Sequence, residues 1–204
     1  MKNKAKALVL SAALLSSTAN AIDLSGTIFD KAAKAYNLDP LLVYSVALAE
    51  SASGRGNGSI SPWPWTLRVP GLPFYAKSED QAKAKLAEFQ QQYGRAIDVG
   101  FMQVSIRWNG HRVSSPADLL DPETNVMVGA EVLSEAIQSS PNDLELGVGR
   151  YHAWEDEIRA RNYGSRVLAI YRNLRDLWGG RNVGTGYYWC VGCKSRQPRS
   201  RRSW

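Results

Sequence analysis

One acidic residue closes a long apolar stretch and has the surroundings of a proton donor. The segment 39–51 has the pattern of a helix buried nearly all round, and Glu50 is its only acid after the N-cap at Asp39. Apolar neighbours and the negative end of the helix dipole both disfavour a carboxylate, so we predict a raised pKa for Glu50. Such a carboxyl suits general acid catalysis near neutral pH. The alternative interpretation is a solvated residue at a helix end.

Other side chains offer weaker chemistry. Asp98 could supply the second carboxylate of a hydrolase, but we favour a structural role at the turn around Gly100. His111 and His152 are the only histidines and form no helix-spaced metal motif, so we predict neither a metal site nor a cofactor. No nucleophile-elbow motif supports a Ser-His-Asp triad either.

The elements that must position these residues are mostly helical. Capping residues and apolar spacing predict helices over 23–36, 39–51, 78–93, 121–137, 141–154 and 162–178. The stretch 97–108 has a β-like period and predicts a short strand or hairpin. Between 51 and 75, Gly and Pro are too dense for a helix or a regular central strand. We therefore predict a mainly α (α+β) domain with a small β hairpin insertion.

Four aromatic residues lie in the Gly- and Pro-rich stretch: Trp63, Trp65, Phe74 and Tyr75. Aromatic side chains on a stiff loop can stack against sugar rings, or they can simply pin the loop onto the core. Both interpretations carry equal weight, and in either case the loop is expected to flank the site.

The first 21 residues have the features of a secretory signal. Lys2, Lys4 and Lys6 precede an apolar run over 7–15, and small residues at Ala19 and Ala21 suit cleavage after Ala21. No later stretch approaches the ~18 apolar residues of a membrane span. We therefore predict an exported protein without a stable membrane span, periplasmic in a Gram-negative cell.

The positive charge of the chain belongs to its ends. The 204 residues carry a net charge of +6, but nine of the 25 basic residues lie in the signal or in the tail 179–204, leaving 16 basic residues against 19 acidic ones between. This balance gives no support for nucleic-acid binding by the single domain predicted over 22–178. The Gly- and Arg-rich tail is expected to be flexible, and its Cys190 and Cys193 to form a local disulfide rather than a redox motif.

Four motifs in order give the chain a family resemblance. They are Glu50-Ser51, the run 100–103 (Gly-Phe-Met-Gln), the Asp-Pro-x-x-Asn opening of a helix at 121–125 with Gly129-Ala130 after it, and Tyr151-His152. In this order and spacing the sequence resembles the soluble lytic transglycosylases of the lysozyme-like superfamily. Two residues differ from the usual pattern of that family, since Phe101 stands in place of Leu and His152 in place of Asn.

The resemblance implies a fold and a reaction. It implies a lysozyme-like α+β fold and cleavage of the β-1,4 bond between N-acetylmuramic acid and N-acetylglucosamine in peptidoglycan, leaving 1,6-anhydro ends. Glu50 would be the catalytic acid and then the base. The residues implied to bind the glycan strand are Ser51, Met102, Gln103, Tyr151 and His152.

The run 98–103 and the segment 64–66 look most like the transglycosylases that accompany conjugation, type IV secretion or pilus systems, which implies components of such machinery as further partners. Two rival interpretations stay open. One is a hydrolytic lysozyme with the same fold and the same Glu50, and the other is a non-catalytic wall-binding assembly factor.

Overall fold

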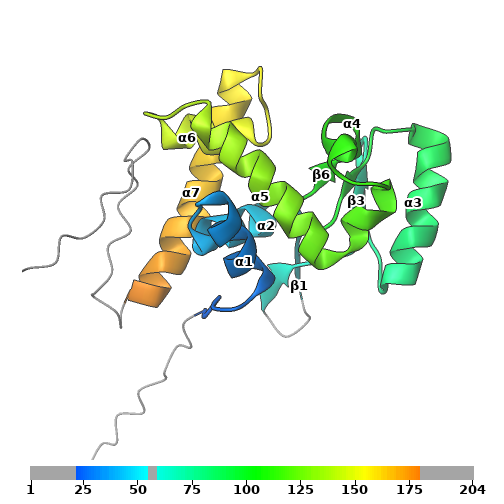
Figure 1. The fold of residues 1–204 in the computed structure, drawn as a ribbon, viewed down its shortest axis with the longest axis horizontal. Coiled ribbons are helices and arrows are strands. Elements are labelled where there is room, and N and C mark those ends of the chain that lie inside the picture. The colour runs from blue at the N-terminus through cyan, green and yellow to red at the C-terminus, as the bar shows by residue number, and fades with distance from the viewer. Residues whose placement is uncertain (1–21, 55–58, 180–204) are drawn as a thin grey trace, which may run out of the picture.

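The computed structural model describes residues 22–54 and 59–179, so the predicted signal, the cysteine pair and nearly all of the predicted tail lie outside the described residues. The long helix α5 (Pro122–Gln138) runs through the middle of the molecule (Figure 1). To one side lie α1 (Ile28–Tyr36), α6 (Leu144–Arg150) and α7 (Glu157–Gly179), and to the other a small sheet and α3 (Glu79–Tyr93). The predicted fold class, a mainly helical lysozyme-like α+β domain, is confirmed.

The helix that carries Glu50 begins where its sequence predicts. α2 (Pro40–Ser51) is capped by Asp39, whose carboxylate accepts a hydrogen bond from the backbone N–H of Leu41 at 2.8 Å. Pro40 occupies the first turn, where its missing N–H removes no helical hydrogen bond. Because α2 is apolar on nearly all sides, it packs between α1 and α7 and is buried along most of its length.

The first helix starts later than predicted. α1 begins at Ile28 rather than at 23, because Gly26 has a φ of 71° and Thr27 acts as the N-cap. The carboxylate of Asp30 accepts a hydrogen bond from the Gly26 N–H at 2.9 Å, which fixes this turn.

The stretch between α2 and α3 corrects a prediction, since it contains regular strands. β1 (Ala52–Gly54) pairs with β2 (Ile60–Pro62), and a second sheet has the order β4-β3-β5-β6 with all neighbours antiparallel. Its strands are β3 (Thr66–Val69), β4 (Leu72–Tyr75), β5 (Asp98–Val99) and β6 (Val104–Ser105). β3 is central, so the prediction of no regular central strand here is wrong.

The prolines of this stretch avoid the central strand. Pro70 and Gly71 make the turn between β3 and β4, and Gly71 has a φ of 77°, which suits glycine. Pro73 lies in β4, an edge strand, where the absence of an N–H can be tolerated. The density of Gly and Pro therefore marked turns and an edge rather than an irregular loop.

The predicted strand or hairpin over 97–108 is present as β5 and β6, and it is followed by α4 (Ile106–Asn109) and two short 3-10 helices, η1 (Gly110–Arg112) and η2 (Pro116–Leu120). α3 is capped by Ser78 as predicted, although the Gln81 side chain accepts from the N–H of Lys77 rather than of Ser78. These elements close the sheet end of the molecule.

The last two helices differ from prediction at their junction. α6 ends at Arg150 rather than near Trp154, and α7 begins at Glu157, five residues before the predicted start. Added side chains at Gly149 and Gly164 would collide with the backbones of Ala160 and Glu145, so these glycines allow α6 and α7 to pack closely.

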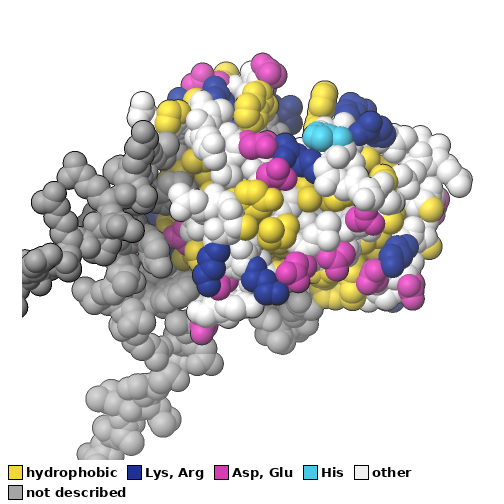
Figure 2. All heavy atoms as spheres, in the orientation of Figure 1, with side chains coloured by type: hydrophobic (Ala, Val, Ile, Leu, Met, Phe, Trp, Pro, Cys, Tyr) yellow, Lys and Arg dark blue, Asp and Glu magenta, His cyan; other side chains and the backbone are white. Residues whose placement is uncertain are grey.

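The surface visible in Figure 2 carries charged side chains of both signs. On the face drawn in Figure 2, acidic and basic side chains are interspersed rather than separated into patches of one sign. Within residues 22–54 and 59–179, the structure contains no helix that is both long enough and apolar enough to cross a membrane.

Candidate active site

Glu50 lies in the last turn of α2 and is almost completely enclosed. Only 7% of the residue is exposed, and its Oε1 atom is buried and accepts no hydrogen bond from the described residues. Burial raises the pKa of the Glu50 carboxyl, and the nearby charge of Asp98 adds to this effect. Arg68 and Arg166 oppose it. The net direction is upward, as the apolar helix pattern predicts.

Two ring side chains face the Glu50 carboxyl. His152 Nδ1 lies 3.9 Å from Glu50 Oε1, which is too long for a hydrogen bond. The Tyr163 hydroxyl is directed at Glu50 closely enough to favour the carboxylate to a lesser degree than burial disfavours it. That hydroxyl is buried and has no hydrogen bond of ordinary geometry in the described part of the chain. A small movement would allow it to donate to the carboxylate.

Histidine 152 and tyrosine 163 form one stacked pair. Their rings are parallel within 2°, with centroids 4.7 Å apart. Burial lowers the pKa of His152, and the charges of Arg159, Arg166 and Arg68 lower it further. Burial thus shifts both the imidazole and the Glu50 carboxyl toward their neutral forms, which disfavours an ion pair between them.

Ser51 is fully buried beside Glu50. Its hydroxyl forms hydrogen bonds with backbone groups and does not face open space. Its single hydroxyl proton is shared between the carbonyl oxygens of Ala47 at 3.0 Å and Phe101 at 2.8 Å, and its oxygen accepts from the N–H of Trp63 at 3.3 Å. It joins the end of α2 to the turn between β5 and β6. Its contact with substrate stays a prediction.

The turn between β5 and β6 is built around a buried asparagine. Asn125 in the first turns of α5 accepts from the N–H of Met102 at 2.9 Å and donates to the carbonyls of Val99 and Leu119 at 2.8 and 2.9 Å. Gly100 has a φ of 81°, and a side chain there would collide with the Asn125 amide. The motif residues thus define one rigid turn.

Gln103 closes the same turn and leaves one oxygen free. Its φ is 45°, and its Nε2 donates to the carbonyls of Thr66 at 3.0 Å and Gly100 at 2.9 Å. Its Oε1 is buried without a hydrogen-bond donor among the described residues. An orphaned acceptor in this position is suited to a hydroxyl or amide of a ligand.

Tyr151 connects α6 to this turn. Its hydroxyl donates to the Met102 carbonyl at 2.6 Å, and its ring stacks on Tyr163 with centroids 6.5 Å apart. Met102 itself is fully buried against Gly129 of α5. The structure therefore brings the six predicted site residues, from α2, the turn between β5 and β6, and the segment directly after α6, into one connected cluster, in which Ser51 and Met102 are internal.

Asp98 stands in β5, paired in register with Ser105 and Arg68. Burial raises the pKa of its carboxyl, while a hydrogen bond from Ser105 and the charges of Arg68 and Arg107 lower it. These partners agree with the favoured structural role at the Gly100 turn.

Three residues that act on the Glu50 carboxyl were not predicted: Tyr163, Arg68 and Arg166. Tyr163 is only 3% exposed and lies four residues before Val167 inside the predicted helix 162–178, so this helical spacing could have placed it on the buried face of α7. Arg68 donates weakly to the Glu50 carbonyl at 3.4 Å and could not be found from sequence, because β3 was not predicted.

The aromatic residues of the strand region mostly pack inward. Trp63 donates from Nε1 to the Ala76 carbonyl at 2.7 Å and meets Trp65 edge to face, and Phe74 packs on Phe89. Among the four, Tyr75 is the exposed one, at 44%. This arrangement favours the interpretation that the aromatic residues pin the segment.

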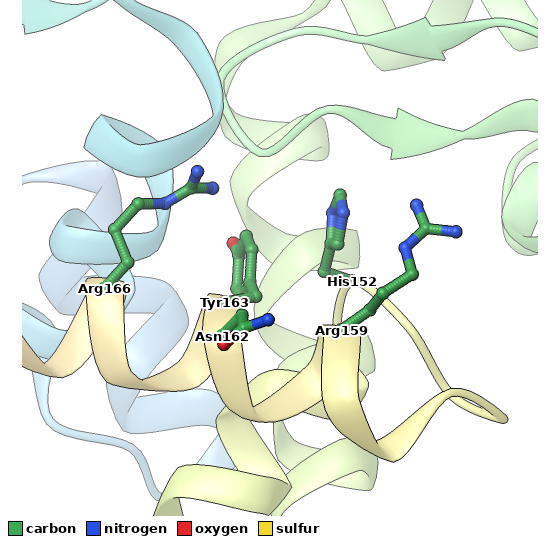
Figure 3. A pocket seen from close by; sticks show the side chains of 5 residues that line it. All are labelled: His152, Arg159, Asn162, Tyr163 and Arg166. Atoms are coloured by element: carbon green, nitrogen blue, oxygen red, sulfur yellow. The ribbon is translucent and has the colours of Figure 1, made fainter.

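A pocket of about 220 Å³ lies beside this cluster and is lined by His152, Arg159, Asn162, Tyr163 and Arg166. Figure 3 shows the side chains of Arg159, Tyr163 and Arg166 projecting from one side of α7, with His152 beside the Tyr163 ring. Within the described ranges, no three His, Cys, Asp or Glu side chains gather as a metal site would require.

A buried acid with a raised pKa lies beside a pocket in a helical domain with a small sheet, an arrangement suited to general acid catalysis. The family model of the transglycosylase SLT domain matches residues 27–166, and the chain belongs to this family. It is therefore a lytic transglycosylase-type enzyme with peptidoglycan as its substrate. The searches of curated proteins and of solved structures returned no match.

Proposed function

We propose that this enzyme cleaves the β-1,4 bond between N-acetylmuramic acid and N-acetylglucosamine and leaves a 1,6-anhydro-muramic acid end. The observation that carries the proposal is the burial of Glu50 with a raised pKa and a free Oε1 next to the pocket. A carboxyl kept protonated by its surroundings can donate where a solvated one would already be ionised.

Glu50 acts twice in the proposed reaction. Its proton passes to the glycosidic oxygen as the bond from that oxygen to C1 of the muramic acid breaks, and positive charge develops on the ring. The resulting carboxylate then takes the proton of the C6 hydroxyl of the same sugar while that oxygen bonds to C1. The acid is regenerated, no water is consumed, and no second carboxylate is needed.

The residues around Glu50 fit the two halves of this cycle. While Glu50 is ionised, Arg68 and Arg166 stabilise its negative charge, and a shift of the Tyr163 hydroxyl would add a hydrogen bond. Before the first proton transfer, burial favours the protonated form of Glu50 more strongly than the two arginines favour the carboxylate. Gln103 Oε1 and the His152 ring, whose pKa is lowered by burial, offer polar contacts for the sugars.

Product analysis tests the proposal. Purified peptidoglycan is digested with the wild-type protein and with Glu50→Gln, and the soluble muropeptides are weighed by mass spectrometry. The expected wild-type products end in anhydro-muramic acid and are lighter by one water than reducing ends, and Glu50→Gln releases almost none. Products with reducing ends alone would assign the protein as a hydrolase, with Asp98 as the candidate second carboxylate.

We further propose that the protein is exported to the periplasm and opens the wall locally for a secretion or conjugation machine. The signal-like residues 1–21 and the motif variants at 64–66 and 98–103 support this assignment. Cell fractionation with N-terminal sequencing is expected to find mature protein beginning at Ile22 in the periplasm. Cytoplasmic protein beginning at Met1 would contradict export.

The machine role has its own test. Glu50→Gln expressed in place of the wild type is expected to reduce transfer or secretion by the machine, with normal protein levels by immunoblot. Full function of that variant would instead favour a non-catalytic assembly factor.

A further inference from the structure

The pocket beside α7 contains arginines that the protein itself does not neutralise. Among the described residues, neither Arg159 nor Arg166 forms an ion pair with an acidic side chain, although Arg161 between them binds Asp143 and Glu157 at 2.9 and 2.8 Å. Within one helix, the arginine on the far side is therefore paired, and the two that line the pocket are not.

The two unpaired arginines share one face and one direction. They are seven residues apart, which places them about two turns and roughly 10 Å from each other along α7. Tyr163 lies between them, and the Arg166 guanidinium is 5.2 Å from the centroid of its ring. Figure 3 shows both guanidinium groups extending away from the helix on the side of Tyr163 and His152.

Their charge is felt by the groups of the candidate active site. Arg159 and Arg166 help to lower the pKa of His152, and Arg166 also favours the ionised form of Glu50. Glu50 stays biased toward its neutral form, because burial has the larger effect. The two guanidinium groups thus place positive charge at the pocket, and neither forms an ion pair with a described acidic side chain.

Arginine in an open pocket is best matched by a carboxylate, which its guanidinium can bind with two parallel hydrogen bonds. Peptidoglycan carries carboxylates only on the O3 substituent of muramic acid: on the lactyl group when the peptide is absent, and on the peptide stem when it is present. N-acetylglucosamine has none.

We propose that Arg159 and Arg166 bind a carboxylate of the O3 substituent of muramic acid and so place that sugar beside Glu50. This inference rests on the proposed function, because it takes the glycan strand as the ligand. It makes the arginine pair the feature that distinguishes muramic acid from N-acetylglucosamine at this position. Arg159 and Arg166 are specificity residues in this account: neither donates or accepts the transferred protons, although Arg166 also favours the ionised form of Glu50.

Binding to defined saccharides tests the inference. The full chain with Glu50→Gln, which prevents turnover, is titrated calorimetrically with three ligands: a neutral N-acetylglucosamine tetramer, a peptide-free tetrasaccharide of the two alternating sugars, and the same tetrasaccharide with peptide stems. Adding Arg159→Gln or Arg166→Gln is expected to weaken binding of the anionic ligands about tenfold each, since hydrogen bonds to charged groups have this size. Binding of the neutral tetramer should stay unchanged.

Arg172→Gln is the matched control, since it removes the same charge from an exposed position of α7. Position 172 lies about 240° around the helix from position 166, so the control should bind all three ligands as the parent does. A loss for both anionic ligands assigns the lactyl carboxylate, and a loss confined to the stemmed ligand assigns the stem. Unchanged anionic binding, or an equal loss for the neutral tetramer, would overturn the inference.

The binding and product-release experiments together distinguish a failure of this inference from a failure of the proposed function. Wild-type protein that releases anhydro products but shows no arginine effect contradicts only the inference. Arginine-dependent binding with no release of anhydro products contradicts only the proposed reaction.

Discussion

The turn at 100–103 and the pocket beside α7 differ in how their polar groups are satisfied. In the turn, Asn125 makes three hydrogen bonds to backbone, and Tyr151 and Gln103 add three more, so that Gln103 Oε1 is the one buried side-chain oxygen of these three residues without a partner among the described residues. Beside the pocket, Glu50 Oε1 and the Tyr163 hydroxyl are buried and unpaired within the described residues. Buried polar atoms are nearly always paired, so the unpaired Glu50 and Tyr163 oxygens beside the pocket are candidates for contact with a ligand.

The site therefore contains two kinds of residue: those that hold the turn in place, and those whose polar groups are free to bind substrate. Side chains of the first kind should cost stability when they are changed. Side chains of the second kind should cost activity and leave stability equal or higher, because an unpaired buried polar group destabilises the folded state.

The largest effect is expected at Glu50 itself. Glu50→Gln keeps the shape but removes the transferable proton, so the rate of anhydro-product release should fall about 10³-fold, within the range of general acid catalysis. The melting temperature, followed by circular dichroism near neutral pH, should not fall. If the variant instead loses activity because it unfolds, Glu50 would be a residue that stabilises the fold, which contradicts its assigned role.

A strong effect on stability is expected at Gly100. Gly100→Ala forces a side chain into the Asn125 amide at a backbone angle that favours glycine. The free energy of unfolding, measured by urea denaturation, should fall by about 3 kcal/mol. The control Gly54→Ala, where an added methyl group meets open space, should change it little.

Tyr151 and Tyr163 allow the two kinds of residue to be compared directly, because replacing either by Phe removes only the hydroxyl group. Tyr151→Phe removes a hydrogen bond to Met102 and should lower the free energy of unfolding by about 1 kcal/mol. Tyr163→Phe removes an unpaired hydroxyl while retaining the stacked ring, so it should leave stability unchanged and reduce turnover about tenfold. The reverse pattern in denaturation and turnover measurements would contradict the two roles.

The pH dependence of stability offers a finer test at Glu50. Burial holds its folded-state pKa above the unfolded value, so its neutral form contributes stability that is complete below the unfolded pKa and is lost as pH rises through the folded pKa. Glu50→Gln has no such loss. The melting temperature of the variant should therefore gain on that of the wild type as pH is raised from acidic to neutral values, and a constant difference would contradict the raised pKa.

The sequence predicted the parts whose signals are local. The cap at Asp39, the apolar pattern that buries Glu50 and the β-like run around Gly100 each depend on neighbouring residues, and they led to the fold class. The start of α7 was placed five residues too late, and Tyr163, although inside the predicted helix, was not assigned to the site because its approach to Glu50 depends on how α7 packs against α2. Arg68 depends on a non-local pairing of β3 with β5, which the Gly and Pro content concealed.

The central claim is that one buried acid transfers both protons and that the sugar's own hydroxyl, rather than water, closes on C1. Digestion of peptidoglycan in heavy-oxygen water, followed by mass spectrometry of the new glycan ends, tests it most directly. The account predicts anhydro-muramic acid ends that carry no heavy oxygen. Reducing muramic acid ends that carry heavy oxygen at C1 would contradict it.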